Sequence, residues 1–267
     1  MKSLLRALCL VCCLLTLPAQ AGTSLAGGKP NFSPEAILQF SKQVEQTLAS
    51  KGARVALIAR AGRPQSEMPE GMHFTHVSFA VYSNITLHDQ RVVPGYAVYN
   101  LYQSDAEPDT STLVQDYPVD FFAAVFSLES GVIIPSPELQ KRLLEVITSP
   151  TYRKLHDPRY SAIANPFTLG RQNCTEHTLD VLFAAIYQTD NIQRIKTSEK
   201  AYFTAQPVNV NPLKLMFGAM FSSEITLSDH ATRPPETATF ETIARFLQKY
   251  DAGAEVLTVT PEIPSKP

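Results

Sequence analysis

The sequence has few cysteines, and three of its four lie within the first 21 residues. Cys9, Cys12 and Cys13 fall in a segment that has the features of a removable export signal. Its removal would leave Cys174 as the only thiol. A redox role that needs a second, resolving cysteine is therefore disfavoured. Cys174 and the nearby His177 are also too small a set for a zinc site, which takes three or four ligands, so we expect no metal.

Long apolar runs and basic patches are also lacking. No apolar run after the N-terminal segment is long enough for a membrane-spanning helix, so we expect no transmembrane segment after signal cleavage. The basic residues are scattered, and the formal net charge of -2 is slightly acidic, which argues against nucleic-acid binding. The sequence shows no internal repeat, no clear linker and no sign of a cofactor.

The N-terminal segment predicts export to the periplasm or the extracellular space. Lys2 and Arg6 flank a short apolar core at residues 4–17, and an A-x-A motif ends at Ala21. Cleavage after Ala21 would leave 246 residues with a formal charge of -4, since Lys2 and Arg6 are lost. That is enough chain for one domain with a full core. We expect a flexible leader at 22–32, a single domain at 33–260 and a tail at 261–267.

Helical periodicity and capping signals predict helices along this domain. Ser33-Pro34 begins an amphipathic helix that stops at Gly52, and Ser136-Pro137 repeats the same start signal. The most apolar helix, at 174–187, is expected at the centre of the fold. Further helices are predicted to start at Asn211-Pro212 and to span 239–250, whereas 104–112 and 152–169 are expected to lack regular structure.

Alternating and β-branched patterns predict strands that form an antiparallel sheet. In the run 74–82, alternation places Val77 and Phe79 on one face, with His76 and Ser78 on the other. A polar connection joins this run to a second strand at 92–102, so the two are expected to pair antiparallel. Shorter strands are expected at 54–59 and 131–134, with an edge strand at 254–259. The chain is therefore predicted to be an α+β domain with helices packed on an antiparallel sheet.

Cys174 lies at the predicted start of the central helix. Free N–H groups and the helix dipole at such a position favour a thiolate, the form of cysteine that attacks carbonyl carbons. An unpaired cysteine in an exported protein is unusual, which also favours a chemical role. The alternative is a small buried apolar residue, which free cysteines often are.

A cysteine nucleophile needs a base, and His76 is the preferred candidate. His76 begins a well-defined strand, where the backbone would hold its ring still. His230 is the main rival, because the neighbouring Asp229 is able to orient a ring. His177 is one turn from Cys174 on the same helix, where the two side chains would not converge on a substrate.

These residues carry a resemblance to known families. The strand His76-Val77-Ser78-Phe79 precedes the segment Asn173-Cys174-Thr175-Glu176 by about a hundred residues, and in this order the pair resembles circularly permuted papain-like (NlpC-type) cysteine hydrolases. The chain as a whole is also similar to an uncharacterised exported bacterial family, domain of unknown function 2145, over most of the mature protein. The motifs that carry this second resemblance are Ala53-Arg54-Val55, Phe74-Thr75-His76-Val77, Tyr99-Asn100-Leu101-Tyr102, Tyr117-Pro118-Val119-Asp120, Asn165-Pro166-Phe167 and Gln172-Asn173-Cys174.

The resemblance implies a permuted papain-like fold, in which an antiparallel sheet packs against the helix that starts at the cysteine. It also implies that Cys174 is the nucleophile and His76 the base. Asn100, on the next strand, is our choice for the residue that orients the imidazole. Gln172 and Asn173 are candidates to stabilise an oxyanion together with the Cys174 N–H. Asn173 also fits the N-cap of the helix, and Glu176 fits a dipole partner or a buried polar anchor.

Two functions are therefore carried forward. The first is an exported thiol hydrolase or acyltransferase that acts on an amide or ester through a Cys-His pair. Its expected partner is a peptide, glycopeptide or lipid substrate of the cell envelope, with cell-wall peptide favoured. The second is a non-catalytic envelope protein that keeps the papain-like core as a scaffold for binding, since a fold does not fix an activity.

Overall fold

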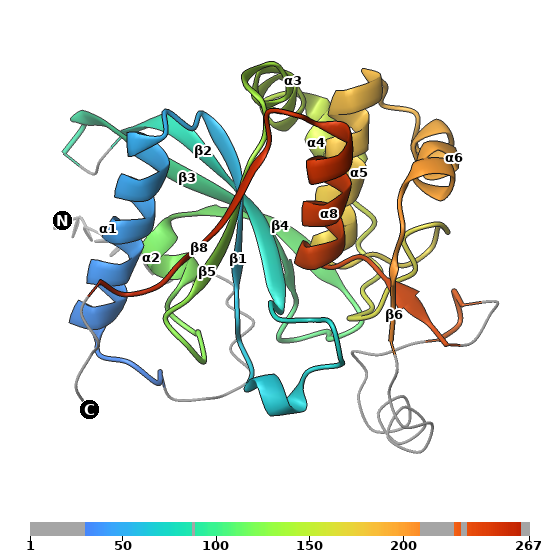
Figure 1. The fold of residues 1–267 in the computed structure, drawn as a ribbon, viewed down its shortest axis with the longest axis horizontal. Coiled ribbons are helices and arrows are strands. Elements are labelled where there is room, and N and C mark those ends of the chain that lie inside the picture. Colours follow the sequence, from blue (N-terminus) through green and yellow to red (C-terminus); the bar gives the residue numbers. More distant parts are fainter. Residues whose placement is uncertain (1–29, 87–88, 209–226, 231–233, 263–267) are drawn as a thin grey trace, which may run out of the picture.

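The computed structural model describes residues 30–86, 89–208, 227–230 and 234–262. It is an α+β fold in which a six-stranded antiparallel sheet has helices on both faces (Figure 1). The predicted fold class and the antiparallel sheet are confirmed at this level. Within the described ranges, no helix is both long and apolar enough to cross a membrane.

The sheet has the strand order β4-β3-β2-β1-β5-β8, and every neighbouring pair is antiparallel. The predicted pairing of the runs 74–82 and 92–102 is confirmed as β2 with β3, and the last strand lies at an edge as expected. The strands are β1 (Val55–Arg60), β2 (His76–Thr86), β3 (Val92–Gln103), β4 (Ser111–Asp116), β5 (Ser130–Ile134) and β8 (Glu255–Val259).

One face of the sheet is covered by α1 (Pro34–Ser50) and the short α2 (Pro118–Phe121) (Figure 1). The Ser33 side chain accepts a hydrogen bond from the Ala36 N–H, and Pro34 occupies the first turn, as the sequence signal predicts. The apolar stripe of α1 packs on strand residues that include Ile58 and Ala80. This face therefore has its own apolar core.

The opposite face carries α3 (Pro137–Ile147), α4 (Pro150–Lys154), α5 (Cys174–Tyr187), α6 (Ile192–Tyr202) and α8 (Phe240–Tyr250) (Figure 1). Most of α5 is buried, which confirms that the most apolar helix is central. Gly131 of β5 makes room here, because a Cβ atom at this position would lie 2.6 Å from the Phe74 ring and 2.7 Å from the Phe240 ring. The close approach of α8 thus requires glycine at this point of the sheet.

The alternation of β2 decides which side chains meet which helices. Val77, Phe79 and Val81 belong to the core beneath α5, whereas Ala80 belongs to the core beneath α1. His76 shares the parity of Ala80, and its ring packs against Phe121 of α2. The predicted division of faces is therefore confirmed, and the imidazole leaves the sheet on the side of α2.

Several elements differ from the sequence expectations. Strand β4 begins at Ser111, inside the segment 104–112 that was expected to be a loop, and α4 includes the start of the region expected to be irregular. A short 3₁₀ turn η1 (Gln65–Glu67), helix α6 and a small two-stranded sheet of β6 (Gln206–Pro207) with β7 (Glu236–Thr237) were not predicted. The helix predicted from Asn211-Pro212, the signal peptide and most of the leader and tail lie outside the described residues.

Candidate active site

Cys174 is the first residue of α5, as the sequence predicts. Asn173 caps the helix through a 2.8 Å hydrogen bond from the Glu176 N–H to its side-chain oxygen. The thiol is free of any disulfide and is 6% exposed. Its Sγ lies 3.7 Å from the Thr175 hydroxyl, and the backbone N–H of Val77 in β2 acts to lower the pKa of the thiol. The helix start is thus held against the beginning of that strand.

Strands β2 and β3 part at the place where Cys174 meets the sheet. Their pairing ends at Phe79 with Tyr99, although β2 begins at His76 and β3 continues to Gln103. The Val77 N–H is therefore free to bond to the thiol, which approaches the split from the α5 face. The imidazole of the preceding residue leaves on the α2 face. In the described residues, Sγ and the ring share no hydrogen bond.

His76 belongs to a buried polar network that we call the strand cluster: Arg60, His76, Ser78, Asn100, Tyr102 and Asp116. The His76 Nε2 atom lies 3.1 Å from the Asn100 Oδ1 atom, so the structure joins the predicted base to the predicted orienting residue. Ser78 donates to the same amide oxygen. The His76 ring also stacks on Tyr102, with ring centroids 5.1 Å apart. The ring is therefore fixed by two neighbouring strands and an aromatic partner.

Asp116 sets the orientation of this network, although the sequence analysis did not identify it. The Asn100 Nδ2 atom donates to the Asp116 Oδ1 at 2.6 Å, and the Tyr102 hydroxyl donates to the Oδ2 at 2.8 Å. Because the amide nitrogen faces the carboxyl group, the amide oxygen must face the imidazole. The His76 Nε2 then carries the hydrogen, which leaves Nδ1 as the ring atom able to accept a proton.

Arg60 supplies the charge of the strand cluster. Its guanidinium donates to the Phe121 carbonyl and lies 5.0 Å from the centroid of the Phe121 ring. Burial and the positive charge of Arg60 together lower the pKa of His76 to about 3, against the hydrogen bond to Asn100. Burial raises the pKa of the Cys174 thiol, whereas the Val77 N–H, the Thr175 hydroxyl and Arg60 act in the opposite direction. Near neutral pH both groups are therefore uncharged.

Burial raises the pKa of Asp116 to about 7, against the hydrogen bond from Tyr102 and the attraction of Arg60. Burial also raises the pKa of Tyr102 far above its usual range. The carboxyl group of Asp116 is thus the member of the strand cluster whose charge changes near neutral pH. A change in its charge acts on Asn100 directly and on His76 through Asn100.

Gln172 and Asn173 have their side-chain amides engaged elsewhere. The Gln172 Nε2 donates to the Leu155 carbonyl at 3.0 Å and to the Asp180 carboxylate at 2.8 Å. The Asn173 Nδ2 donates to the Ala162 carbonyl at 3.0 Å and to the Thr237 hydroxyl at 3.3 Å. Neither amide has a hydrogen left for an oxyanion.

The other histidines considered have different surroundings. The His230 Nε2 lies 2.8 Å from the Ile163 carbonyl, and its Nδ1 accepts from the Glu236 N–H at 3.4 Å. His177 is 2% exposed and packs edge-on against Tyr152, with ring centroids 4.8 Å apart. Burial lowers the pKa of His177 to about 3. His230 and His177 are therefore built into the surrounding structure.

A second buried network, which we call the helix cluster, joins α5 to α6: Glu176, Asp180, Lys196 and Glu199. The Lys196 ammonium lies 2.8 Å from Glu176, 2.7 Å from Asp180 and 3.2 Å from Glu199. Burial raises the pKa of Glu176 and Glu199. Burial alone would lower the pKa of Lys196, but the three carboxylates raise it well above its usual value. Glu176 is thus a buried anchor, one of the two roles considered for it.

A comparison with protein families shows to which family the chain belongs. The model of a family described as uncharacterised proteins conserved in bacteria (DUF2145) matches residues 47–247. The chain belongs to this family. The similarity to domain of unknown function 2145 noted in the sequence is therefore confirmed, and the match contains every residue of both clusters. Searches of curated proteins and of solved structures found no match.

Proposed function

We propose that this member of the family is an exported thiol hydrolase or acyltransferase with a circularly permuted papain-like core. Cys174 is the nucleophile, His76 the general base and Asn100 the orienting residue. The substrate is an amide or ester of the cell envelope, with cell-wall peptide favoured over a lipid ester. The N-terminal signal segment supports export to the periplasm or the extracellular space.

The observation that carries the proposal is the connected path from Asp116 through Asn100 to His76, which ends one residue from Val77, whose backbone N–H acts to lower the pKa of the thiol. A fixed amide selects the His76 tautomer that a general base requires. Arg60 favours both a neutral imidazole and a thiolate. The buried cation thus favours the thiolate that attack requires, while it makes His76 a weaker base.

In the proposed reaction, Sγ attacks the carbonyl carbon of the substrate while the thiol proton moves to His76 Nδ1. Backbone N–H groups at the start of α5 stabilise the resulting oxyanion. The imidazolium then gives its proton to the leaving amine or alcohol, and a thioester on Cys174 remains. Water or another acceptor cleaves the thioester and restores the thiol. Because the thiol lies on the α5 face and the imidazole on the α2 face, the reaction requires Sγ and Nδ1 to approach each other across the split between β2 and β3.

Alkylation of the single mature cysteine tests the proposal. Mature protein, His76→Ala and His73→Ala are treated with iodoacetamide between pH 6 and pH 9, with glutathione as the reference thiol. His73 is the control histidine, because its ring contacts Gln65 and Glu129 outside the strand cluster. We expect Cys174 to react faster than glutathione at pH 6. The rate should fall at least tenfold in His76→Ala and stay unchanged in His73→Ala.

The same proteins are then incubated with p-nitrophenyl acetate, and the mass of the Cys174 peptide is measured. An acetyl adduct that forms in the wild-type protein and fails to form in Cys174→Ser supports a thioester intermediate. The proposed enzymatic activity is refuted if Cys174 reacts no faster than glutathione in all three alkylation samples and gains no acetyl group.

The second candidate is a non-catalytic envelope protein that uses this core for binding. It is favoured by the burial of the thiol, which raises the pKa of Cys174, and by the pKa of about 3 at His76. In this case Cys174 is a small core residue and the strand cluster maintains the fold. Cys174→Ala would then leave binding unchanged, and the thiol would become reactive only at alkaline pH.

A further inference from the structure

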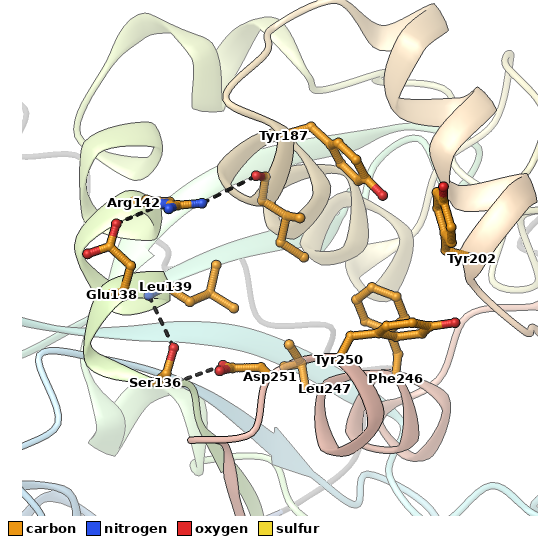
Figure 2. A pocket seen from close by; sticks show the side chains of 11 residues that line it. Ser136, Glu138, Leu139, Arg142, Tyr187, Tyr202, Phe246, Leu247, Tyr250 and Asp251 are labelled. Carbon is orange, nitrogen blue, oxygen red and sulfur yellow. Dashed lines mark hydrogen bonds and ion pairs between the residues drawn. The ribbon is translucent and has the colours of Figure 1, made fainter.

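A pocket of about 490 Å³ lies on the helical face, between α3, the end of α5, α6 and α8 (Figure 2). It is separate from the candidate active site, because Cys174 begins α5 and the pocket residue Tyr187 ends it. The 14 residues of α5 place these two ends about 20 Å apart. The volume falls within the range of small-molecule sites.

The aromatic side of the pocket is formed by rings that are partly exposed to solvent. Tyr187 is 42% exposed, Tyr202 is 51% exposed and Tyr250 is 50% exposed. The rings of Tyr187 and Tyr202 are nearly parallel, at 24°, with centroids 6.3 Å apart. The Phe246 ring packs against Tyr250, with centroids 5.0 Å apart. Three helices therefore contribute to one continuous aromatic surface, shown in Figure 2.

The side toward α3 is charged. The Arg142 Nε lies 3.0 Å from the Glu138 carboxylate, and its Nη1 donates to the Ile186 carbonyl at 3.5 Å. Asp251 accepts from the Ser136 N–H at 2.8 Å. The side chains of Arg142 and Glu138 are 33% and 65% exposed. This wall offers both hydrogen-bond donors and acceptors to a ligand.

We propose that this pocket binds a short uncharged oligosaccharide. The apolar C–H faces of sugar rings stack on the tyrosine rings, and their hydroxyl groups both donate to the carboxylates and accept from the guanidinium. An apolar peptide would fit the aromatic side, but it would bury the charged wall without partners, which is costly. The two unlike walls thus match a ligand with apolar ring faces and a polar rim. This inference does not depend on the proposed thiol chemistry.

Binding of chitotetraose and cellotetraose to the mature chain tests the inference, by calorimetry and by saturation transfer from protein to sugar protons. We expect at least one of the two sugars to bind, with transfer strongest to the ring C–H protons. Tyr202→Ala should raise the Kd at least tenfold. Tyr82→Ala is the matched control, because Tyr82 is 41% exposed and lies on β2 outside the pocket. The Kd of the Tyr82→Ala protein for the sugar should stay within twofold of the wild-type value.

A urea midpoint measured for each variant shows whether it is folded, and Tyr187→Phe gives a second, milder change within the pocket. A decaproline peptide serves as the competing ligand. The inference is overturned if neither sugar binds, if the folded Tyr202→Ala protein binds as tightly as wild type, or if only decaproline binds. Because the readout is binding, failure of the thiol assays leaves this result unaffected.

Discussion

The two buried polar clusters of this protein are built in contrasting ways. In the strand cluster, hydrogen bonds link Asp116, Asn100 and His76 across three neighbouring strands. In the helix cluster, three carboxylates surround the single ammonium of Lys196, and both Glu199 oxygens lack a hydrogen-bond partner in the described residues. The strand cluster fixes the orientation of each member, whereas the helix cluster holds two helices together by charge. Four changes test this contrast, from the largest expected effect to the smallest.

Removal of the ammonium should have the largest effect. Lys196→Met leaves three buried acidic groups without their cation, and we expect the free energy of unfolding to fall by about 4 kcal/mol, because an uncompensated buried charge is costly. Lys154→Met is the control, since Lys154 forms an exposed pair with Asp190 and should cost at most about 1 kcal/mol. Urea unfolding measures both. Equal losses would mean that the helix cluster does not link α5 to α6.

Removal of the central amide tests the strand cluster. Asn100→Ala leaves His76, Ser78 and Asp116 without a shared partner, and we expect a loss of about 3 kcal/mol in the free energy of unfolding. Asn31→Ala removes a single hydrogen bond to the Val125 carbonyl and should cost about 1 kcal/mol. If Asn100→Ala costs no more than Asn31→Ala, the network does not act as a unit.

The pH dependence of stability should change when Asp116 is replaced. Its pKa is raised from 3.8 to about 7, so its stabilising contribution is complete below pH 3.8 and is lost as the pH rises through 7. The stability of the wild-type protein relative to Asp116→Asn should therefore fall between pH 4 and pH 8. Urea unfolding at each pH measures the difference.

The comparison with Asp116→Asn is needed because the shifted pKa of His76 changes stability with pH in the opposite direction. Its pKa is lowered from 6.5 to about 3, so its contribution is present above pH 6.5 and is lost as the pH falls through 3. Both proteins retain His76, so the part of its contribution that does not depend on Asp116 cancels in their difference. A difference that rises with pH would show that Asp116 is ionised well below neutrality.

The smallest effect is expected at the cap of α5. Asn173→Ala removes the hydrogen bond from the Glu176 N–H, together with two bonds from the Asn173 amide, and we expect a loss of about 1.5 kcal/mol. Asn191→Ala removes an exposed cap of α6 and should cost about 0.5 kcal/mol. Thermal unfolding of both variants ranks the two caps. The reverse order would mean that the start of α5 is held by packing alone.

Local patterns predicted much of the fold, and they failed where buried positions are polar. The caps at Ser33 and Asn173 and the alternation of β2 were readable because each depends on residues close in sequence. Helix α6 was missed because two of its three buried residues, Lys196 and Glu199, are charged, so its inner face reads as solvent-exposed. Strand β4 was missed for the same reason, since both of its buried residues, Ser111 and Asp116, are polar.

The candidate site shows the same division. Cys174 at a helix start and His76 at a strand start followed from position and pattern, whereas the contact of His76 with Asn100 was expected from the resemblance. The amides of Gln172 and Asn173, considered for an oxyanion, are instead bonded to Leu155, Ala162 and Thr237, which are distant in sequence. The role of Asp116 also required knowledge of how β3 pairs with β4.

The sequence by itself determined the helix caps, the apolar central helix and the two faces of β2, because these depend on periodicity and on neighbours within a turn. Only the tertiary structure decided that β2 and β3 part beside Cys174, that the imidazole lies on the α2 face, and that Lys196 meets three carboxylates. The physical reason is that burial and pairing set the charge and orientation of these groups, and both arise from contacts between segments far apart along the chain.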